Sequence, residues 1–342
     1  MEPFVLYTFA CTMAGIVSAG TIAILRRVAS AKLADKPDNQ LKCHTRTAVT
    51  AGGSGILAGL IVSLVLVRLC TQFPTGTLHN LRGILLGSLL IFSMGLLDDF
   101  TKPLGLPIWL KLLLQVAATG ALVYYDVCIH LFSVPWLDYP LTFLWVVGLT
   151  NAFNLLDIMD GLCVSQAIVC LLGLVFITLP AEYVYVNFAA LTTLGACVAF
   201  WPYNYHKRSP VFLGDSGSNL LGFIIAALSM GADYSTHWDW GFLAPLLIAA
   251  VPIFDTSFVV LARLLKRKNP LKGSNDHAAL RLKYNGWKPS SIVTMFILAG
   301  LICNLLARCL VHGNLTTAAL IFASLTAGSV AATCYLLRLK VP

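Results

Sequence analysis

Long apolar segments recur along the entire 342-residue chain, and each is close to the length needed to cross a membrane. An α-helix rises 1.5 Å per residue, so about 20 apolar residues span the ~30 Å hydrocarbon core. Composition agrees, because 58% of the residues are hydrophobic and 11% are charged, against about 25% charged in soluble domains. The sequence therefore predicts an all-α polytopic membrane protein and excludes a soluble enzyme with a single anchor.

We predict eleven transmembrane helices in one domain that covers residues 1–342. The predicted spans are 4–25, 53–71, 79–97, 108–125, 130–150, 162–180, 183–202, 218–232, 241–262, 291–309 and 315–337. The first is too long for a signal peptide and lacks a small-residue cleavage site, so we expect it in the mature protein. Ten cysteines, mostly inside apolar spans and without a CxxC pair, are interpreted as small core residues rather than a disulfide or zinc framework.

Lysine and arginine set the expected orientation, because cytoplasmic loops of membrane proteins are enriched in them. With the N-terminus outside, all but three of the 23 basic residues fall on inner segments. The exceptions are Arg68, Arg82 and Arg308, near outer helix ends. The net charge of +8 then faces anionic lipid headgroups and anionic substrates. We therefore expect contacts with membrane lipids and no nucleic-acid partner.

Five polar patches that contain aspartate interrupt the apolar chain. A charge near hydrocarbon costs about 2.5–3.5 kcal/mol, so such residues favour a functional interpretation. The patches are Asp98–Asp99, residues 151–161, Asn204 together with 212–218, residues 263–288, and residues 35–53. All five fall on the cytoplasmic side of the predicted topology, which was set from basic residues alone. Several acids on one face predict a metal-dependent site for an anionic substrate.

Two adjacent carboxylates end the third predicted span, in residues 95–100 (GLLDDF). Asp98 and Asp99 could face a metal together, or one could act as a base whose pKa the other raises. A pair of solvated interfacial acids is the alternative, and this motif alone does not separate the two interpretations.

Polar residues recur at every third position in residues 151–162 (NAFNLLDIMDGL). On a helical turn this places Asn151, Asn154 and Asp157 along one face, which Asp160 continues. Amide and carboxylate oxygens are the hard ligands that Mg²⁺ takes, together with substrate phosphates. Capping of a helix N-terminus explains one or two of these residues but not four, so we favour a functional interpretation.

Glycines and serines surround one aspartate in residues 212–219 (FLGDSGSN). We expect a tight turn before the eighth helix, with exposed N–H groups around Gly214 and Ser218 that cradle phosphate oxygens while Asp215 holds a metal. The segment is not a Walker P-loop, because GxxxxGK[ST] does not occur in the sequence. A plain Asp cap is the alternative.

Histidines and basic residues in two loops extend the candidate set. His277 and Arg281 can clamp a diphosphate, the arginine in bidentate geometry, whereas the lysines around them fit an ordinary positive-inside loop. In the early loop, Lys42 and His44 could bind a phosphate group, although that signal is weak by itself.

One acid lies deeper in the membrane than the others. Asp255 falls inside the ninth predicted span, three residues after Pro252, which invites a helix break. A structural role as a cap of the broken helix and a functional role in a lipid-facing groove are equally good interpretations.

Taken together and in this order, the motifs resemble the polyprenyl-phosphate N-acetylhexosamine-1-phosphate transferases, the MraY/WecA type of glycosyltransferase family 4. The resemblance runs from about Asp35 to Lys288 and rests chiefly on residues 151–162 and 212–219. It implies a bundle of about ten or eleven helices with a cytoplasmic active site. It also implies transfer of a HexNAc 1-phosphate, most simply GlcNAc 1-phosphate, from a UDP-sugar to undecaprenyl (polyprenyl) phosphate. UMP is released, and the lipid-linked sugar diphosphate begins a cell-envelope glycan.

The resemblance also implies roles for individual residues. Asp215 is the main Mg²⁺ ligand with Asn154 as a second, and Mn²⁺ is an expected substitute. Asp98 and Asp99 face the lipid phosphate, and one removes its proton. We prefer direct attack by that phosphate and keep a covalent Asp intermediate open. Residues and resemblance together give the expected substrate-binding set Lys42, His44, Asn151, Asp157, Asp160, Asn204, Phe212, Gly214, Ser218, His277 and Arg281. Within it, Asp157 and Asp160 line the nucleotide site, and uracil stacks on Phe212 beside Asn204.

The chain departs from the family pattern at several positions. Lys102 stands where a third Asp is frequent, Ile158 where a Gly often follows Asp157, and Leu280 where a second His is common. The early loop lacks the usual Arg and Pro before its Gly pair. We interpret these differences as a divergent, WecA-like member that accepts a UDP-HexNAc. Transfer of phospho-MurNAc-pentapeptide is the alternative, less favoured because the run of adjacent histidines is absent.

Other functional classes fit less well. A CDP-alcohol phosphotransferase would need Ala-Arg where Val164-Ser165 stands. An ion-coupled transporter would place its acids near the membrane midplane and often shows internal repeats, whereas here the acids gather at one interface. An inactive scaffold relative is disfavoured by the core Asp and Asn residues. We expect a multi-pass protein of the bacterial inner membrane and leave the oligomeric state open, a homodimer included.

Overall fold

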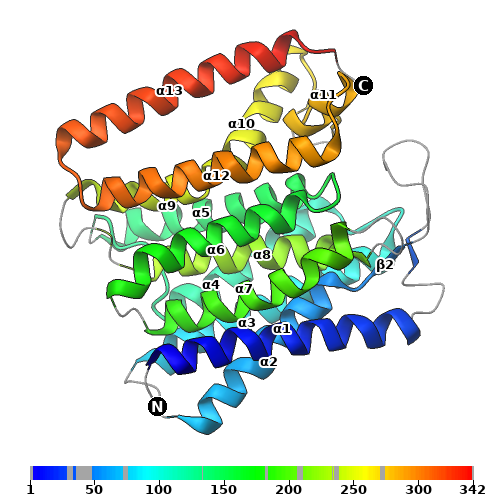
Figure 1. Cartoon of the computed structure of the whole chain (residues 1–342), viewed down its shortest axis with the longest axis vertical. Helices are drawn as coiled ribbons and strands as arrows, with labels where there is room; N and C mark the ends of the chain where they lie inside the picture. The colour runs from blue at the N-terminus through cyan, green and yellow to red at the C-terminus, as the bar shows by residue number, and fades with distance from the viewer. Residues whose placement is uncertain are drawn as a thin grey trace.

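The computed structural model describes residues 3–28, 34–35, 48–71, 76–132, 134–181, 184–205, 211–232, 234, 239–269 and 274–340. Helices dominate this part of the chain, and most run side by side (Figure 1). They are α1 Pro3–Val28, α2 Gly52–Cys70, α3 Thr77–Thr101, α4 Ile108–Tyr124, α5 Pro135–Leu156, α6 Leu162–Thr178, α7 Val184–Tyr205, α8 Gly214–Met230, α9 Ala244–Ile248, α10 Ala250–Leu265, α11 Ala278–Tyr284, α12 Pro289–Val311 and α13 Leu315–Arg338. Two 3-10 turns, η1 Leu179–Ala181 and η2 Asp239–Leu243, precede α7 and α9.

Each predicted apolar segment is helical, the ninth as the run from η2 to α10. Within the described residues, seven helices are long and apolar enough to cross a membrane, and an eighth span follows if the bent pair of α9 and α10 counts as one. The shorter α4 and α6 are also apolar. The all-α polytopic architecture is therefore confirmed, while the number of eleven spans and the orientation stay predictions.

The ninth predicted span is broken, but not at the expected residue. The helices meet at an angle of 71°, and Ala249 separates α9 from α10. Pro252 has no N–H to donate to the carbonyl of Ile248 four residues earlier. That carbonyl instead accepts a hydrogen bond from the Cys170 thiol at 3.2 Å. The proline thus acts one turn before its own position.

A small sheet, absent from the all-α prediction, joins two loops at one end of the helices. Strand β1 (Ala34–Asp35) pairs antiparallel with β2 (Ala48–Thr50), which pairs parallel with β3 (Val211–Phe212). The strands β2 and β3 lead directly into α2 and α8, so the parallel pairing sets the N-termini of these two helices side by side. The Gly53 N–H donates to the Leu213 carbonyl at 3.1 Å across this junction.

Helix α8 lies at the centre of the larger apolar core, packed by α2, α3 and α5. Close approach depends on glycines at two crossings. A Cβ added at Gly95 of α3 would stand 2.4 Å from the Ser216 Cα of α8, and one at Gly222 would stand 2.6 Å from the Leu149 carbonyl oxygen of α5. A second apolar cluster joins α10, α11 and α12, and α13 lies along the outer edge (Figure 1).

We predict that Gly95→Ala destabilises the protein by about 1–3 kcal/mol, the usual cost of overpacking a tight contact. The neighbouring atom belongs to backbone and cannot rotate away. The matched control is Gly120→Ala on α4, where an added Cβ meets nothing within 4 Å. Thermal unfolding in detergent micelles measures both variants. Equal melting temperatures for the two would show that the close α3–α8 crossing is wrong.

Candidate active site

The predicted functional patches come together where several helix ends meet. The C-terminal ends of α3, α5 and α7 lie at the same end of the bundle as the N-terminal ends of α4 and α8. The β2–β3 junction is also there, as Figure 1 shows for β2 and the adjoining helices. Neighbouring antiparallel helices are joined by short loops, so every second loop falls at the same end of the bundle. The residues of those loops are therefore brought together.

Asp99 fastens the end of α3 to the start of α8. Its Oδ1 accepts the Asp215 N–H at 3.0 Å, and its Oδ2 accepts the N–H and hydroxyl of Ser216 at 3.1 and 3.0 Å. A carboxylate at this place satisfies N–H groups that a helix start leaves unpaired and complements the helix dipole. The expected tight turn with exposed N–H groups before the helix is therefore corrected. Residues from Gly214 form the first turn of α8 itself, and Asp99 occupies the N–H groups of Asp215 and Ser216.

Asp98 points to the other side of the same helix end. It is 2% exposed, and its Oδ1 accepts the Leu106 N–H at 2.5 Å while its Oδ2 pairs with the Lys111 ammonium of α4. Lys111 also lies 3.9 Å from Asp215 Oδ2. Lys111 thus joins the carboxyl groups of Asp98 and Asp215. Two carboxyls so close together attract cations strongly.

Lys102 supplies a second positive charge. Its Nζ lies 2.8 Å from Asp99 Oδ1 and 3.1 Å from Asp215 Oδ1. Burial opposes the charged ammonium, but the Asp215 and Asp99 carboxylates outweigh that effect and raise the pKa of Lys102 above its usual range. The departure noted in the sequence, a lysine in place of an aspartate, therefore adds a fixed cation to the acidic cluster.

Amide side chains of α5 and α8 lie beside the carboxylates. Asn154 Oδ1 accepts the Ser218 hydroxyl at 2.9 Å, and Ser218 is one turn beyond Asp215. Asn151 donates to Gln115 of α4 at 2.8 Å. A further amide, Asn219, donates to the Asp215 carbonyl at 2.7 Å. The predicted face of α5 is thus turned toward the start of α8, as the three-residue spacing indicated.

Asp157 directly follows α5 and belongs to the same electrostatic cluster. Burial, and then the charge of Asp215, raise the pKa of Asp157 to about 7, while Lys102 opposes this rise. Asp160 is exposed and adds a smaller repulsive contribution at Asp157. Asp98, Asp99, Asp157 and Asp215 thus outnumber the two lysines at this end of the bundle.

Three more predicted residues shape the junction around α8. Asn204 accepts the Gly161 N–H at 2.7 Å and donates to the Val211 carbonyl at 3.0 Å, so it ties the loop after α5 to β3. Phe212 is half-buried in β3. Gly214 has φ of +75°, and an added Cβ would stand 2.6 Å from Asp99 Oδ2. Only glycine fits this backbone conformation without strain.

His277 and Arg281 lie in a separate group around α10, α11 and α13. His277 Nδ1 is 2.7 Å from Asp255 Oδ2, and both side chains are almost completely buried. Arg281 bonds to Asp276 at 2.8 Å and to the Leu336 carbonyl at 2.9 Å. Asp255 therefore anchors the loop before α11. Substrate contacts by His277 and Arg281 stay predictions. Lys42 and His44 lie outside the described residues, so their predicted contacts stay predictions as well.

The donor set of this cluster fits a magnesium ion. Asp215 and Asp157 offer carboxylate oxygens and Asn154 offers an amide oxygen, which are the hard ligands that Mg²⁺ takes. The side chain of Asp215 is 24% exposed, so water and phosphate oxygens could complete the coordination. The excess of carboxyl groups over lysines is consistent with a bound cation. Asp99 instead holds the start of α8 beside this donor set, and Asp98 pairs with Lys111.

Four polar residues at the site were not among the predicted site residues: Lys102, Lys111, Gln115 and Asn219. Lys111 and Gln115 stand four residues apart on the otherwise apolar α4, which puts them on one helix face. Asn219 likewise follows Asp215 by four residues. This spacing could have identified both pairs from sequence. Lys102 could have been identified only from its partners in the fold.

Comparison with known proteins finds a matching family and several relatives. Residues 81–233 match the family described as Glycosyl transferase family 4. The chain is 29% identical over 309 residues to the "Probable undecaprenyl-phosphate N-acetylglucosaminyl 1-phosphate transferase" of Bacillus subtilis, covering 86% of this chain and 83% of that protein. It is 30% identical over 244 residues to the "Phospho-N-acetylmuramoyl-pentapeptide-transferase" of Streptococcus suis, covering 66% and 69%. The enzyme of that name from Latilactobacillus sakei is 29% identical over 274 residues, covering 75% and 82%.

Proposed function

We propose, from the premise that this chain belongs to glycosyl transferase family 4, that it transfers a HexNAc 1-phosphate from a UDP-sugar to a polyprenyl phosphate. The expected donor is UDP-GlcNAc and the expected acceptor is undecaprenyl phosphate. UMP leaves, and a lipid-linked sugar diphosphate forms as the starting unit of a cell-envelope glycan. The proposed setting is the cytoplasmic face of a bacterial inner membrane, where the basic loops of the predicted topology lie.

The observation that carries this proposal is the meeting of Asp98, Asp99 and Asp215 with Lys102 and Lys111 at one end of a membrane bundle. Both substrates carry phosphates, and their mutual repulsion must be offset for them to approach. Fixed ammonium groups attract the phosphates, and the carboxylates hold those ammonium groups in place. A lipid substrate reaches the site from the bilayer, while the nucleotide arrives from water.

Asp98 and Asp99 take different parts in this proposal. Every oxygen of Asp99 is engaged by Lys102 or the start of α8, so Asp99 positions Asp215 rather than the substrate. Asp98 has fewer backbone partners and faces Lys111 and Asp215. We assign to Asp98 the removal of the remaining proton from the lipid phosphate, whose oxygen then attacks the β-phosphorus of the UDP-sugar. Proton transfer of this kind contributes about 10²–10⁴-fold to a rate.

Asp215, Asn154 and Asp157 would hold Mg²⁺, which when bound offsets the charge of the diphosphate and of the departing UMP. Lys102 and Lys111 keep the acidic cluster neutral enough for two anionic substrates to enter. Asn151, bonded to Gln115, and Ser218, bonded to Asn154, fix the side chains around these ligands. We extend the nucleotide pocket to Asp160, Asn204 and Phe212, which lie on the adjoining loop and strand.

Transfer of phospho-MurNAc-pentapeptide is the second candidate, since relatives of that printed name match most of the chain. The loop before α11 offers His277 alone, and the Asp255 carboxylate holds its Nδ1. The sequence has no run of adjacent histidines at this loop. We therefore place a UDP-HexNAc ahead of UDP-MurNAc-pentapeptide.

UMP release by the purified, detergent-solubilised protein tests the reaction. UDP-GlcNAc, UDP-GalNAc and UDP-MurNAc-pentapeptide are supplied in parallel with Mg²⁺, each with and without undecaprenyl phosphate. We expect UMP with UDP-GlcNAc, and only when the lipid phosphate is present. Asp215→Ala should lower release by more than about 100-fold, because a group that holds charge in the transition state is lost. A folded protein that releases no UMP from any donor would overturn the proposal.

Asp98→Asn separates the proton-transfer role from a purely structural one. The amide oxygen can still accept the Leu106 N–H, but the side chain no longer takes a proton. We expect kcat to fall by about 10²–10⁴-fold with the KM for UDP-GlcNAc changed only slightly. Steady-state kinetics over a range of donor concentrations measure both constants. A raised KM with unchanged kcat would move Asp98 to the nucleotide pocket instead.

A further inference from the structure

The loop between α4 and α5 holds a second cluster of side chains of the kinds that bind metal ions. This loop holds Asp126, Cys128 and His130 at alternate positions, just after α4 ends at Tyr124. Helix α4 begins next to Asp98 and runs to the other end of the bundle, so this loop is about 25 Å from the candidate active site by helix length alone. The candidate magnesium ligands therefore do not reach it.

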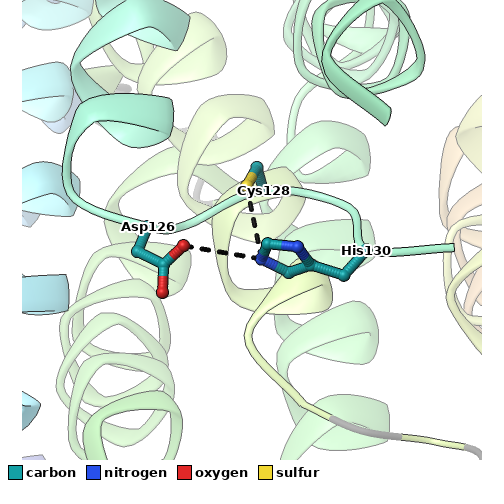
Figure 2. Close-up of side chains that lie close together, drawn as sticks. All are labelled: Asp126, Cys128 and His130. Carbon is teal, nitrogen blue, oxygen red and sulfur yellow. Dashed lines mark hydrogen bonds and ion pairs between the residues drawn. The ribbon is translucent and has the colours of Figure 1, made fainter. Parts of the chain in front are cut away.

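The three donor atoms converge on one point, as Figure 2 shows. The His130 Nε2 lies 3.4 Å from the Cys128 Sγ and 3.6 Å from the Asp126 Oδ1. All three donor atoms lie within 4.8 Å of one another. A catalytic relay would use both ring nitrogens, one toward the thiol and one toward the carboxylate. Here the same nitrogen faces both, which is the arrangement of ligands around a shared ion.

The two separations from the His130 ring nitrogen match tetrahedral coordination. Zinc binds sulfur at about 2.3 Å and nitrogen or oxygen at about 2.0–2.2 Å. Ligand atoms at tetrahedral angles are then about 3.3–3.6 Å apart, as follows from those bond lengths. The separations from His130 Nε2, 3.4 Å to the Cys128 Sγ and 3.6 Å to the Asp126 Oδ1, fall in this range. Thiolate, imidazole and carboxylate are also a mixed set that zinc accepts and that magnesium does not.

The loop is held in place independently of any ion. The buried Asp138 carboxylate accepts the N–H groups of Leu131, Phe132 and Val134 at 2.9–3.2 Å. The Thr142 hydroxyl accepts the Ile129 N–H at 3.0 Å. These bonds fix the backbone on both sides of His130. Preorganisation of this kind lowers the entropy cost of bringing ligands together.

The first ligand position carries backbone strain. Asp126 has φ of +58°, which side chains other than glycine rarely adopt. Strain of this kind persists where the surroundings require it and often marks a functional position. In this conformation the Asp126 carboxylate lies beside His130. Cys128 is 3% exposed, whereas the side chains of Asp126 and His130 are 75% and 62% exposed.

We propose that Asp126, Cys128 and His130 bind one zinc-class divalent ion, with water in the fourth position. The buried sulfur forms the floor of the site, and the exposed carboxylate and imidazole leave the outer side open to solvent. In the predicted topology this ion lies outside the membrane, opposite the reaction. It restrains the connection between α4 and α5 and stabilises the folded state by mass action.

Cobalt is the probe for this site, because Co²⁺ takes zinc positions and its bond to a thiolate absorbs in the near ultraviolet. The full-length protein in detergent micelles is titrated with Co²⁺ in the presence of excess Mg²⁺, which occupies the carboxylate cluster at the other end but avoids sulfur. We expect thiolate absorption that saturates at one Co²⁺ per chain and disappears when Zn²⁺ is added.

Two ligand variants and one control complete the experiment. Cys128→Ser should remove the thiolate absorption. His130→Ala should weaken Co²⁺ binding by at least about tenfold, because even the loss of a group that only hydrogen-bonds a metal ligand costs about that much affinity. Cys309→Ser changes an exposed thiol at the end of α12 and should leave the titration unchanged. Melting temperatures without metal establish that each variant is folded. Absence of thiolate absorption in the unmodified protein, or its persistence in Cys128→Ser, would overturn the proposal.

Discussion

The bond between the Asp99 carboxylate and the first turn of α8 is the interaction on which the candidate site depends. It joins the end of α3 to the start of α8, and it fixes Asp215 one residue into that helix. A buried carboxylate is stable here only because N–H groups, a hydroxyl and an ammonium surround it. Glycines at 95 and 214 permit the close approach that these bonds require. The same contact therefore sets both the packing of α3 against α8 and the position of the Asp215 carboxylate.

Fixed positive charge is the second requirement. Asp98, Asp99, Asp157 and Asp215 would repel each other and any phosphate substrate if nothing offset their charge. Lys102 and Lys111 supply part of that offset from the protein itself, and oxygen ligands remain for a divalent ion. The separate cluster at the other end of α4 has sulfur and imidazole donors instead. Ligand chemistry thus distinguishes the two ends of one bundle, hard oxygen ligands at one and a zinc-type set at the other.

The sequence predicted the helices well, because long apolar runs have few other solutions in a membrane. It also predicted that Asn154, Asp157 and Asp215 would come together, since alternate connections of an antiparallel bundle share one side. It did not predict the β2–β3 junction, whose strands are too short to show a pattern. It did not separate Asp98 from Asp99, because neighbouring residues on a helix face different elements and the sequence does not identify those elements. The bond from Arg281 to the Leu336 carbonyl was also hidden, because this partner lies near the far end of α13, 55 residues along the chain.

A double-mutant cycle between Asp99→Asn and Ser216→Ala tests the central contact directly. Unfolding free energies in detergent micelles are compared for the two single variants and the double variant. Asp99→Asn with Ser229→Ala is the control pair, because Ser229 lies at the far end of α8 from the contact with Asp99. If Asp99 fastens α3 to α8, the first pair should show a coupling of about 0.5–3 kcal/mol and the control pair should be additive. Additive effects in the first pair would contradict the account.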